Sequence, residues 1–356
     1  MEETEKIKQA MEAWTKLELT PRDKDRLSRK FTVEFNYNSN HIEGNTLTYG
    51  QTELLLLFGK VAGEAEMHDL EEMKASNVGL KMMTVESENI EMPLTQNFIR
   101  LLHQTLIRED YTVYRTLPGG VQTSYVIHAG QYKTRPNSVI TRYGDRFEYA
   151  SPEETPALMT DLVNWYNEEE KKKELAPYEL ATLFHYRYIR IHPFEDGNGR
   201  IARLLVNYIL ARHGYPMIVV RSRKKQEYLE ALHRSDLNVG PSPAEGAHAE
   251  LAQIKPFLEY FYGVIAEEIM GDVKFVSERG DDVWWYDGEQ IRFRSHNNSV
   301  MLHAMIDNRK ITIAALQQLA GINKSAVQKF LKQMTDKGYV SRNEDGTWRV
   351  IITPTL

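Results

Sequence analysis

The 356-residue sequence contains no cysteine, which excludes disulfide bonds and thiol catalysis and fits a reducing cytoplasm. Its first residues, Met-Glu-Glu-Thr-Glu-Lys, lack the basic and apolar segments of an export signal. No hydrophobic run approaches the length needed to cross a membrane, so we expect a cytoplasmic protein with no membrane partner. The formal charge of −6 argues against nucleic-acid binding by the chain as a whole.

Helical periodicity dominates what is present. The segment 1–30 is charged and amphipathic, 54–81 carries an apolar stripe, and 94–108, 151–170 and 177–191 continue in the same style. Between 112 and 149, glycines separate short β-rich runs such as 121–127. With 42% hydrophobic residues, the chain is long enough for two or three domains, and we expect a mainly α fold.

The most informative segment is 192–203, which reads His-Pro-Phe-Glu-Asp-Gly-Asn-Gly-Arg-Ile-Ala-Arg. Gly197 and Gly199 bracket Asn198 at the start of an apolar-periodic run, so we expect a loop that presents unpaired backbone N–H groups at a helix N-terminus. Such a terminus attracts phosphate through its free donors and its dipole. The segment therefore indicates phosphate chemistry.

Three side-chain types in this segment suit that chemistry. His192 has an ordinary pKa of about 6.5, so a large neutral fraction can accept a proton at cytoplasmic pH. Asp196 is a hard oxygen ligand of the kind that holds Mg²⁺ together with substrate phosphates. Arg203 follows Arg200 by three residues, so both guanidinium groups lie on one helix face.

The segment matches the signature of the Fic family, His-Pro-Phe-x-Asp/Glu-Gly-Asn-Gly-Arg-x-x-Arg, at every specified position. The resemblance implies transfer of AMP from ATP to a hydroxyl side chain (Ser, Thr or Tyr) of a target protein or of the enzyme itself, with release of pyrophosphate. It implies the following roles: His192 as general base, Asp196 as the Mg²⁺ ligand, Gly197, Asn198 and Gly199 as a phosphate cradle, Arg200 on the α/β phosphates and Arg203 on the γ-phosphate.

Neighbouring residues have simpler explanations. Glu195 is a solvated loop carboxylate, and His185, seven residues before His192 on one helix face, is a buried brace rather than a metal ligand. Tyr228 and Leu229 lie on a later helix that closes over the nucleotide in Fic folds, which makes both candidate adenine contacts. Core packing is the alternative for each.

A β-hairpin is predicted just upstream, with strands at 139–141 and 147–149 and a turn at Tyr143-Gly144-Asp145. In Fic enzymes a hairpin at this place is the flap that binds the target polypeptide as an added strand. A purely structural hairpin is the alternative. The approach to it, 130–133, is similar to the family pattern, but Lys133 stands where an arginine is usual.

A second motif precedes the core. Ser39-Asn40-His41-Ile42-Glu43-Gly44-Asn45 resembles the Fic inhibitory motif Ser/Thr-x-x-x-Glu-Gly/Asn. The resemblance implies that Ser39, Glu43 and Gly44 are inhibitory residues and that Glu43 pairs with Arg203, in competition with the γ-phosphate. The alternative is that Gly44-Asn45 only ends a helix.

The last residues, 311–356, suggest two helices around Gly321 and a hairpin turning at Asp345-Gly346, a pattern similar to a winged helix-turn-helix domain. The segment carries a net charge of +3 against −9 for the rest. Its outer helix face (Lys324, Ser325, Gln328, Lys329, Lys332) suits DNA, although winged helices also serve as docking or dimerisation modules, which leaves a homodimer open.

These observations predict an N-terminal helical region with the inhibitory motif (1–90), a Fic catalytic core (91–275), a linker (276–310) and a winged-helix domain (311–356). The expected function is AMP transfer with ATP and Mg²⁺. Two alternatives stay open at this point: removal of AMP by the same site, and a DNA-binding regulator whose core senses a nucleotide. The intact set around His192 favours an enzyme over a sensor.

Overall fold

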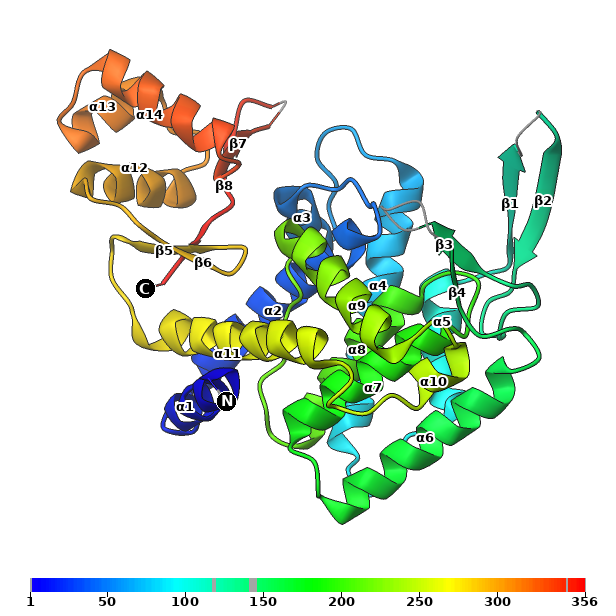
Figure 1. Ribbon diagram of the computed structural model, residues 1–356. Helices are drawn as coiled ribbons and strands as arrows, with labels where there is room; N and C mark the ends of the chain where they lie inside the picture. Colours follow the sequence, from blue (N-terminus) through cyan, green and yellow to red (C-terminus); the bar gives the residue numbers. More distant parts are fainter. Residues whose placement is uncertain (1, 117–119, 141–145, 344, 356) are drawn as a thin grey trace. The chain divides into compact units, whose positions relative to one another are not determined.

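The computed structural model describes residues 2–116, 120–140, 146–343 and 345–355, and it is mainly helical (Figure 1). Packing divides the chain into two units. The first contains residues up to Lys8, Phe35–Thr46 and Met67–Ala266, and the second contains Gln9–Glu34, Leu47–Glu66 and the chain from Glu267 onward. The helices α1 (Glu2–Thr15), α2 (Pro21–Ile42) and α11 (Lys255–Ser277) contribute residues to both units.

The first unit is a helical bundle around α7 and α8. Nearly every residue of α7 is buried, and a helix buried on all faces needs neighbours on every side. These neighbours are α8, which packs along α7, and α6 and α10; α4 in turn packs on α8 (Figure 1). The helices of this unit are α4 (Met67–Glu88), α5 (Gln96–Ile107), α6 (Thr155–Lys172), α7 (Pro177–Ile191), α8 (Asn198–Arg212), η1 (Ser222–Lys224), α9 (Lys225–Val239) and α10 (Pro243–Ala247).

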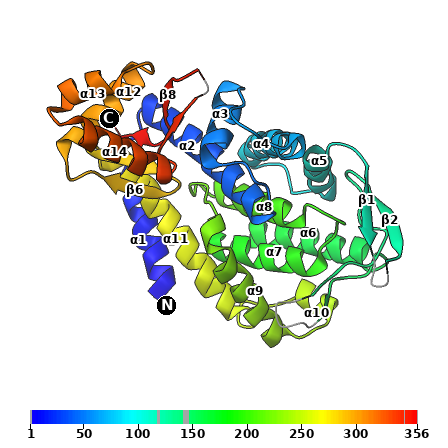
Figure 2. The same cartoon turned by 90° about the horizontal axis from the view of Figure 1, so that it is seen from above.

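Two antiparallel hairpins belong to this unit. β1 (Tyr111–Thr116) pairs with β2 (Gln122–Ile127) and projects from the helices in both views (Figures 1 and 2). β3 (Ser138–Ile140) pairs with β4 (Arg146–Glu148), with Val139 opposite Phe147. The predicted hairpin is therefore present, with each strand beginning one residue earlier than expected, and its role as a target-binding flap stays a prediction. The predicted turn, Tyr143-Gly144-Asp145, lies outside the described residues.

The second unit contains short helices and strands. β5 (Val283–Tyr286) is the middle strand of a sheet of order β6-β5-β9, with β6 at Glu289–Arg292 and β9 at Thr353–Pro354. A separate hairpin pairs β7 (Val340–Arg342) with β8 (Trp348–Val350). The helices of this unit are α3 (Tyr49–Phe58), α12 (His296–Asp307), α13 (Ile313–Ala320) and α14 (Lys324–Asp336).

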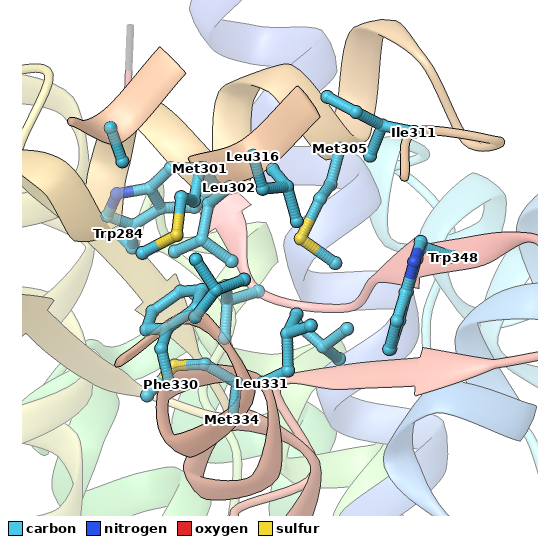
Figure 3. Close-up of a cluster of buried hydrophobic side chains, with 14 residues drawn as sticks. Trp284, Met301, Leu302, Met305, Ile311, Leu316, Phe330, Leu331, Met334 and Trp348 are labelled. Atoms are coloured by element: carbon cyan, nitrogen blue, oxygen red, sulfur yellow. The ribbon is translucent and has the colours of Figure 1, made fainter. Parts of the chain in front are cut away.

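Residues 276–310, expected to be a linker, are folded. Trp284 from β5 and Met301 and Met305 from α12 lie in one hydrophobic core with Phe330 of α14 and Trp348 of β8 (Figure 3). The linker expectation failed because this segment lacks strong periodicity, while its large apolar side chains find partners in residues 311–356. The expected order of helix, turn at Gly321, helix and hairpin is present, and its assignment as a winged-helix module stays a prediction.

The apolar stripe over 54–81 corresponds to two helices rather than one. Gly59 adopts φ +64°, a left-handed conformation that glycine tolerates, and its N–H closes the last turn of α3 on Leu55. The chain resumes helix only at Met67. Periodicity continued across the break, but the glycine ended the helix.

Candidate functional site

The segment 192–203 forms the turn between α7 and α8 and the first turns of α8. His192 ends α7 in the left-handed region, φ 52° and ψ 61°, and its N–H donates to the Tyr188 carbonyl at 2.9 Å. Gly197, at φ 76°, precedes the first residue of α8. The backbone N–H groups of Asn198 and Gly199 begin α8 and so have no acceptor four residues back within the helix. The loop thus has the anion-attracting geometry that the sequence predicts.

The imidazole of His192 is held neutral. Its ring stacks on Tyr149 at a centroid distance of 3.9 Å and an angle of 12°. Burial, reinforced by the charge of Lys133, lowers the pKa of His192 to about 3. The neutral ring has an unoccupied lone pair over the whole physiological pH range and can accept a proton.

Lys133 fastens the end of α7. Its ammonium donates to the carbonyls of Ile191 at 3.1 Å and His192 at 2.9 Å and to Asn137 Oδ1 at 2.8 Å. A cation suits the carbonyl end of a helix. Lys133, which stands where an arginine is usual in the family, therefore still supplies a donor to the end of α7. The sequence alone does not reveal this role.

The side chain of Asn198 braces the loop and does not face outward. Its Oδ1 accepts from the Phe194 N–H at 3.0 Å, and its Nδ2 donates to the Phe194 carbonyl at 2.7 Å. The expected phosphate contact of Asn198 is therefore left to its backbone N–H. The side-chain amide of Asn198 is satisfied by the backbone of Phe194, because a tight loop of six residues must pair its own polar groups.

Asp196 is anchored but accessible. Oδ1 accepts from the Gly197 N–H at 2.6 Å, and Oδ2 accepts from the Tyr111 hydroxyl at 2.7 Å. Burial would raise the pKa of Asp196, but Arg200, Tyr111 and the Gly197 amide outweigh it, so the pKa lies below its usual value. The side chain stays 44% exposed. An ionised, accessible carboxylate with a lone pair to spare on each oxygen fits a Mg²⁺ ligand.

His103 contacts the same loop at Asp196 and Phe194. Its Nδ1 accepts the Gly130 N–H at 2.9 Å, which assigns the proton to Nε2, 3.2 Å from the Asp196 carbonyl. Its ring stacks on Phe194 at 3.8 Å, and burial lowers the pKa of His103 to about 4. The neutral imidazole therefore holds both the Asp196 carbonyl and the Phe194 ring of the loop. No motif in the sequence marks this residue.

The two motif arginines are buried, with exposed fractions of 4% for Arg200 and 2% for Arg203. Arg200 donates to Glu72 Oε1 at 2.7 Å. Arg203 donates through Nη2 to Glu43 Oε1 at 2.6 Å and to the Ser39 carbonyl at 2.8 Å, and through Nε to Ser39 Oγ at 3.0 Å. The predicted contact of Glu43 with Arg203 is present. The contact of Glu72 with Arg200 was not predicted.

The backbone after α2 positions Glu43 for its contact with Arg203. Gly44, at φ +107°, follows the end of α2, so the helix-ending alternative for Gly44 is correct without displacing the Glu43 contact. A side chain at Gly199 would overlap Glu43 Oε1. The second glycine of the signature therefore leaves the space that the carboxylate occupies.

The remaining candidates divide. Tyr228 is buried, and its hydroxyl lies 3.0 Å from His185 Nε2, which favours core packing over an adenine contact. Leu229 is 43% exposed and free to contact a ligand. His185 is fully buried, as expected of a brace. Glu195 accepts from Thr134 Oγ1 at 3.1 Å.

Comparison with known proteins agrees with this geometry. The Fic/DOC family model matches residues 93–210. A solved structure of a Fic domain containing signaling protein from Bacteroides thetaiotaomicron VPI-5482 is 53% identical, with a TM-score of 0.70, over 76% of this chain and 96% of that one. This chain belongs to the Fic family. The matched range includes the segment 192–203, and with it His192 and Arg203.

Curated Fic relatives are more distant and longer. Protein adenylyltransferase fic-1 of Caenorhabditis briggsae is 28% identical over 235 residues, which are 66% of this chain and 40% of the relative. A Fic family protein from Desulfovibrio desulfuricans G20 is 20% identical, with a TM-score of 0.59, over 98% of this chain and 94% of that one, and supports the fold. Among the described residues, no helix has both the length and the apolar character to span a membrane.

Proposed function

We propose that this Fic protein transfers AMP from ATP to a hydroxyl side chain of a protein and that Glu43 inhibits the transfer. The observation that carries the proposal is the buried Arg203, whose Nε and Nη2 donate to Ser39 and Glu43 beside an otherwise complete signature loop. Relatives named protein adenylyltransferase support the reaction type.

In the proposed reaction, the target's hydroxyl oxygen forms a bond to the α-phosphorus, and the bond between that phosphorus and the bridging oxygen to the β-phosphate breaks. Pyrophosphate leaves, and the hydroxyl proton passes to neutral His192. Burial and Lys133 lower the pKa of His192, and the negative charge of a bound nucleotide would act in the opposite direction and strengthen the base.

The other residues position phosphate. Asp196 would hold Mg²⁺, which when bound neutralises phosphate charge, and the first amides of α8 with Arg200 would bind the phosphate oxygens. Arg203 would bind the γ-phosphate once Glu43 leaves it. Because Glu43 and the γ-phosphate need the same guanidinium donors, the resting contact misaligns the nucleotide and slows transfer.

The test is transfer of labelled AMP by Glu43→Gly protein, with and without His192→Ala. Loss of a general base costs about 10² to 10⁴ in rate, whereas ATP binding should persist because the phosphate contacts remain. A His192→Ala form that labels its target as fast as its parent would refute the role of this histidine. Removal of AMP, the second activity open to such a site, is tested by offering both forms a pre-modified target.

A further inference from the structure

We propose that Glu72 is a positioning residue for Arg200: it limits this arginine to a long 3.6 Å contact with Asp196 and so leaves the aspartate able to bind a divalent cation. The proposal rests on the proposed function, since it concerns the same phosphate site. Glu72 belongs to α4, outside both the signature and the inhibitory motif.

The carboxylate of Glu72 is fixed from two sides. Oε1 accepts from Arg200 Nη1 at 2.7 Å, and Oε2 accepts from Asn45 Nδ2 at 3.2 Å. Asn45 is buried and also donates to the Asp69 carbonyl at 3.0 Å. Because two donors hold the two oxygens, the carboxylate has one orientation, and so does the guanidinium bound to it.

Arg200 has few other acceptors. Its Nε is buried without a hydrogen-bond partner among the described residues, and its Nη2 lies 3.6 Å from Asp196 Oδ2. Without the charge of Glu72, Asp196 is the nearest anion, so the guanidinium would close on it. An arginine paired with Asp196 competes with a cation for the same oxygens. Glu72 therefore maintains the separation on which phosphate and metal binding depend.

The same geometry argues against a separate metal site at Glu72. His68, Asp69 and Glu72 lie close enough to share a cation. However, Glu72 already accepts from Arg200, and Asp69 Oδ2 already accepts from the Thr46 N–H at 2.8 Å. Glu72 acts through the arginine.

The experiment compares Glu72→Gln, Glu72→Ala and the matched control Glu71→Gln, each in full-length Glu43→Gly protein. Glu71 is the neighbouring acid of α4, is 48% exposed and pairs with Arg108 instead of the site. Two quantities are measured: the Kd for ATP by calorimetry across a Mg²⁺ titration, and kcat and KM for AMP transfer. A His192→Ala copy of each form prevents turnover during the binding measurement.

We expect Glu72→Gln to weaken ATP binding about 10-fold or more, to raise the half-saturating Mg²⁺ concentration severalfold, and to raise KM more than it lowers kcat. Glu72→Ala should show larger changes, and Glu71→Gln should stay within about twofold. A merely structural role would lower the melting temperature without moving the Mg²⁺ midpoint. If Glu72→Ala does not fold, the shape-preserving Gln form decides.

An unchanged Kd and Mg²⁺ midpoint in Glu72→Gln would overturn the proposal. The binding measurement stands apart from the proposed reaction. Should Glu43→Gly protein bind ATP but transfer no AMP, the proposed function fails while the Glu72 result remains interpretable.

Discussion

Replacing Glu43 by glycine removes the carboxylate that occupies Arg203. The guanidinium is 2% exposed, so it remains a buried cation that also donates to the Oγ and the carbonyl of Ser39. A buried cation without an anionic partner is costly and binds the next anion that reaches it. In the proposed site that anion is the γ-phosphate of ATP, so transfer should increase.

The size of the increase follows from the contact. A hydrogen bond to a charged group contributes about 1.5–3 kcal/mol. The Glu43 side chain is 38% exposed, so water screens part of the interaction, and we take about 1–2 kcal/mol. That range corresponds to roughly 5–30-fold faster transfer.

The assay measures labelled AMP transfer by the parent, Glu43→Gly, Arg203→Ala and the double variant. Glu43→Gln is the matched control, because it keeps the side-chain shape and loses the charge, and it should be intermediate. Arg203→Ala should not be activated, and the double variant should match it, as expected of two groups that act through one contact. Equal rates for the parent and Glu43→Gly would refute the inhibitory role.

Three further predictions concern the metal ligand, the buried histidines and the C-terminal helices. Asp196→Ala should abolish the Mg²⁺ dependence of ATP binding, and an unchanged metal titration would remove this residue from the site. Burial lowers the pKa values of His103 to about 4 and His185 to about 3, below the unfolded value of about 6.5. The unfolded chain thus binds more protons below pH 6.5, so the free energy of unfolding should fall by up to about 1.4 kcal/mol per pH unit for each histidine as pH drops. The contribution of these histidines stays flat above that pH, and urea unfolding between pH 7.5 and 5 checks the predicted loss of stability. If α14 contacts DNA, the double substitution Lys329→Glu and Lys332→Glu should remove salt-sensitive retention on duplex DNA and spare AMP transfer. If the parent protein is not retained on DNA even at low salt, a docking or dimerisation role is favoured instead.

The local geometry of the site was predictable from the sequence. The glycines at 197 and 199, the start of α8 and the order of His192, Asp196 and the two arginines are properties of neighbouring residues, so the pattern carries them. The contact of Glu43 with Arg203 spans 160 positions, and only the resemblance to the family suggested it.

Long-range partners without a motif were not predictable. Glu72, His103 and Tyr111 stand in ordinary helix or strand positions, and only folding brings them to Arg200 or Asp196. For the same reason, the sequence did not predict the buried contact between the Tyr228 hydroxyl and His185. Local periodicity specifies which face of an element is apolar, but not which element packs against it.

We propose that this Fic protein adds AMP to proteins and that Glu43 restrains the transfer. The most direct test of this claim is mass spectrometry of a cell lysate incubated with labelled ATP and either parent, Glu43→Gly or Glu43→Gly with His192→Ala. We predict serine, threonine or tyrosine residues that carry one AMP group with Glu43→Gly, few with the parent and none above background with the His192→Ala double variant. AMP on no residue with any form, or equally with and without His192, would contradict the claim.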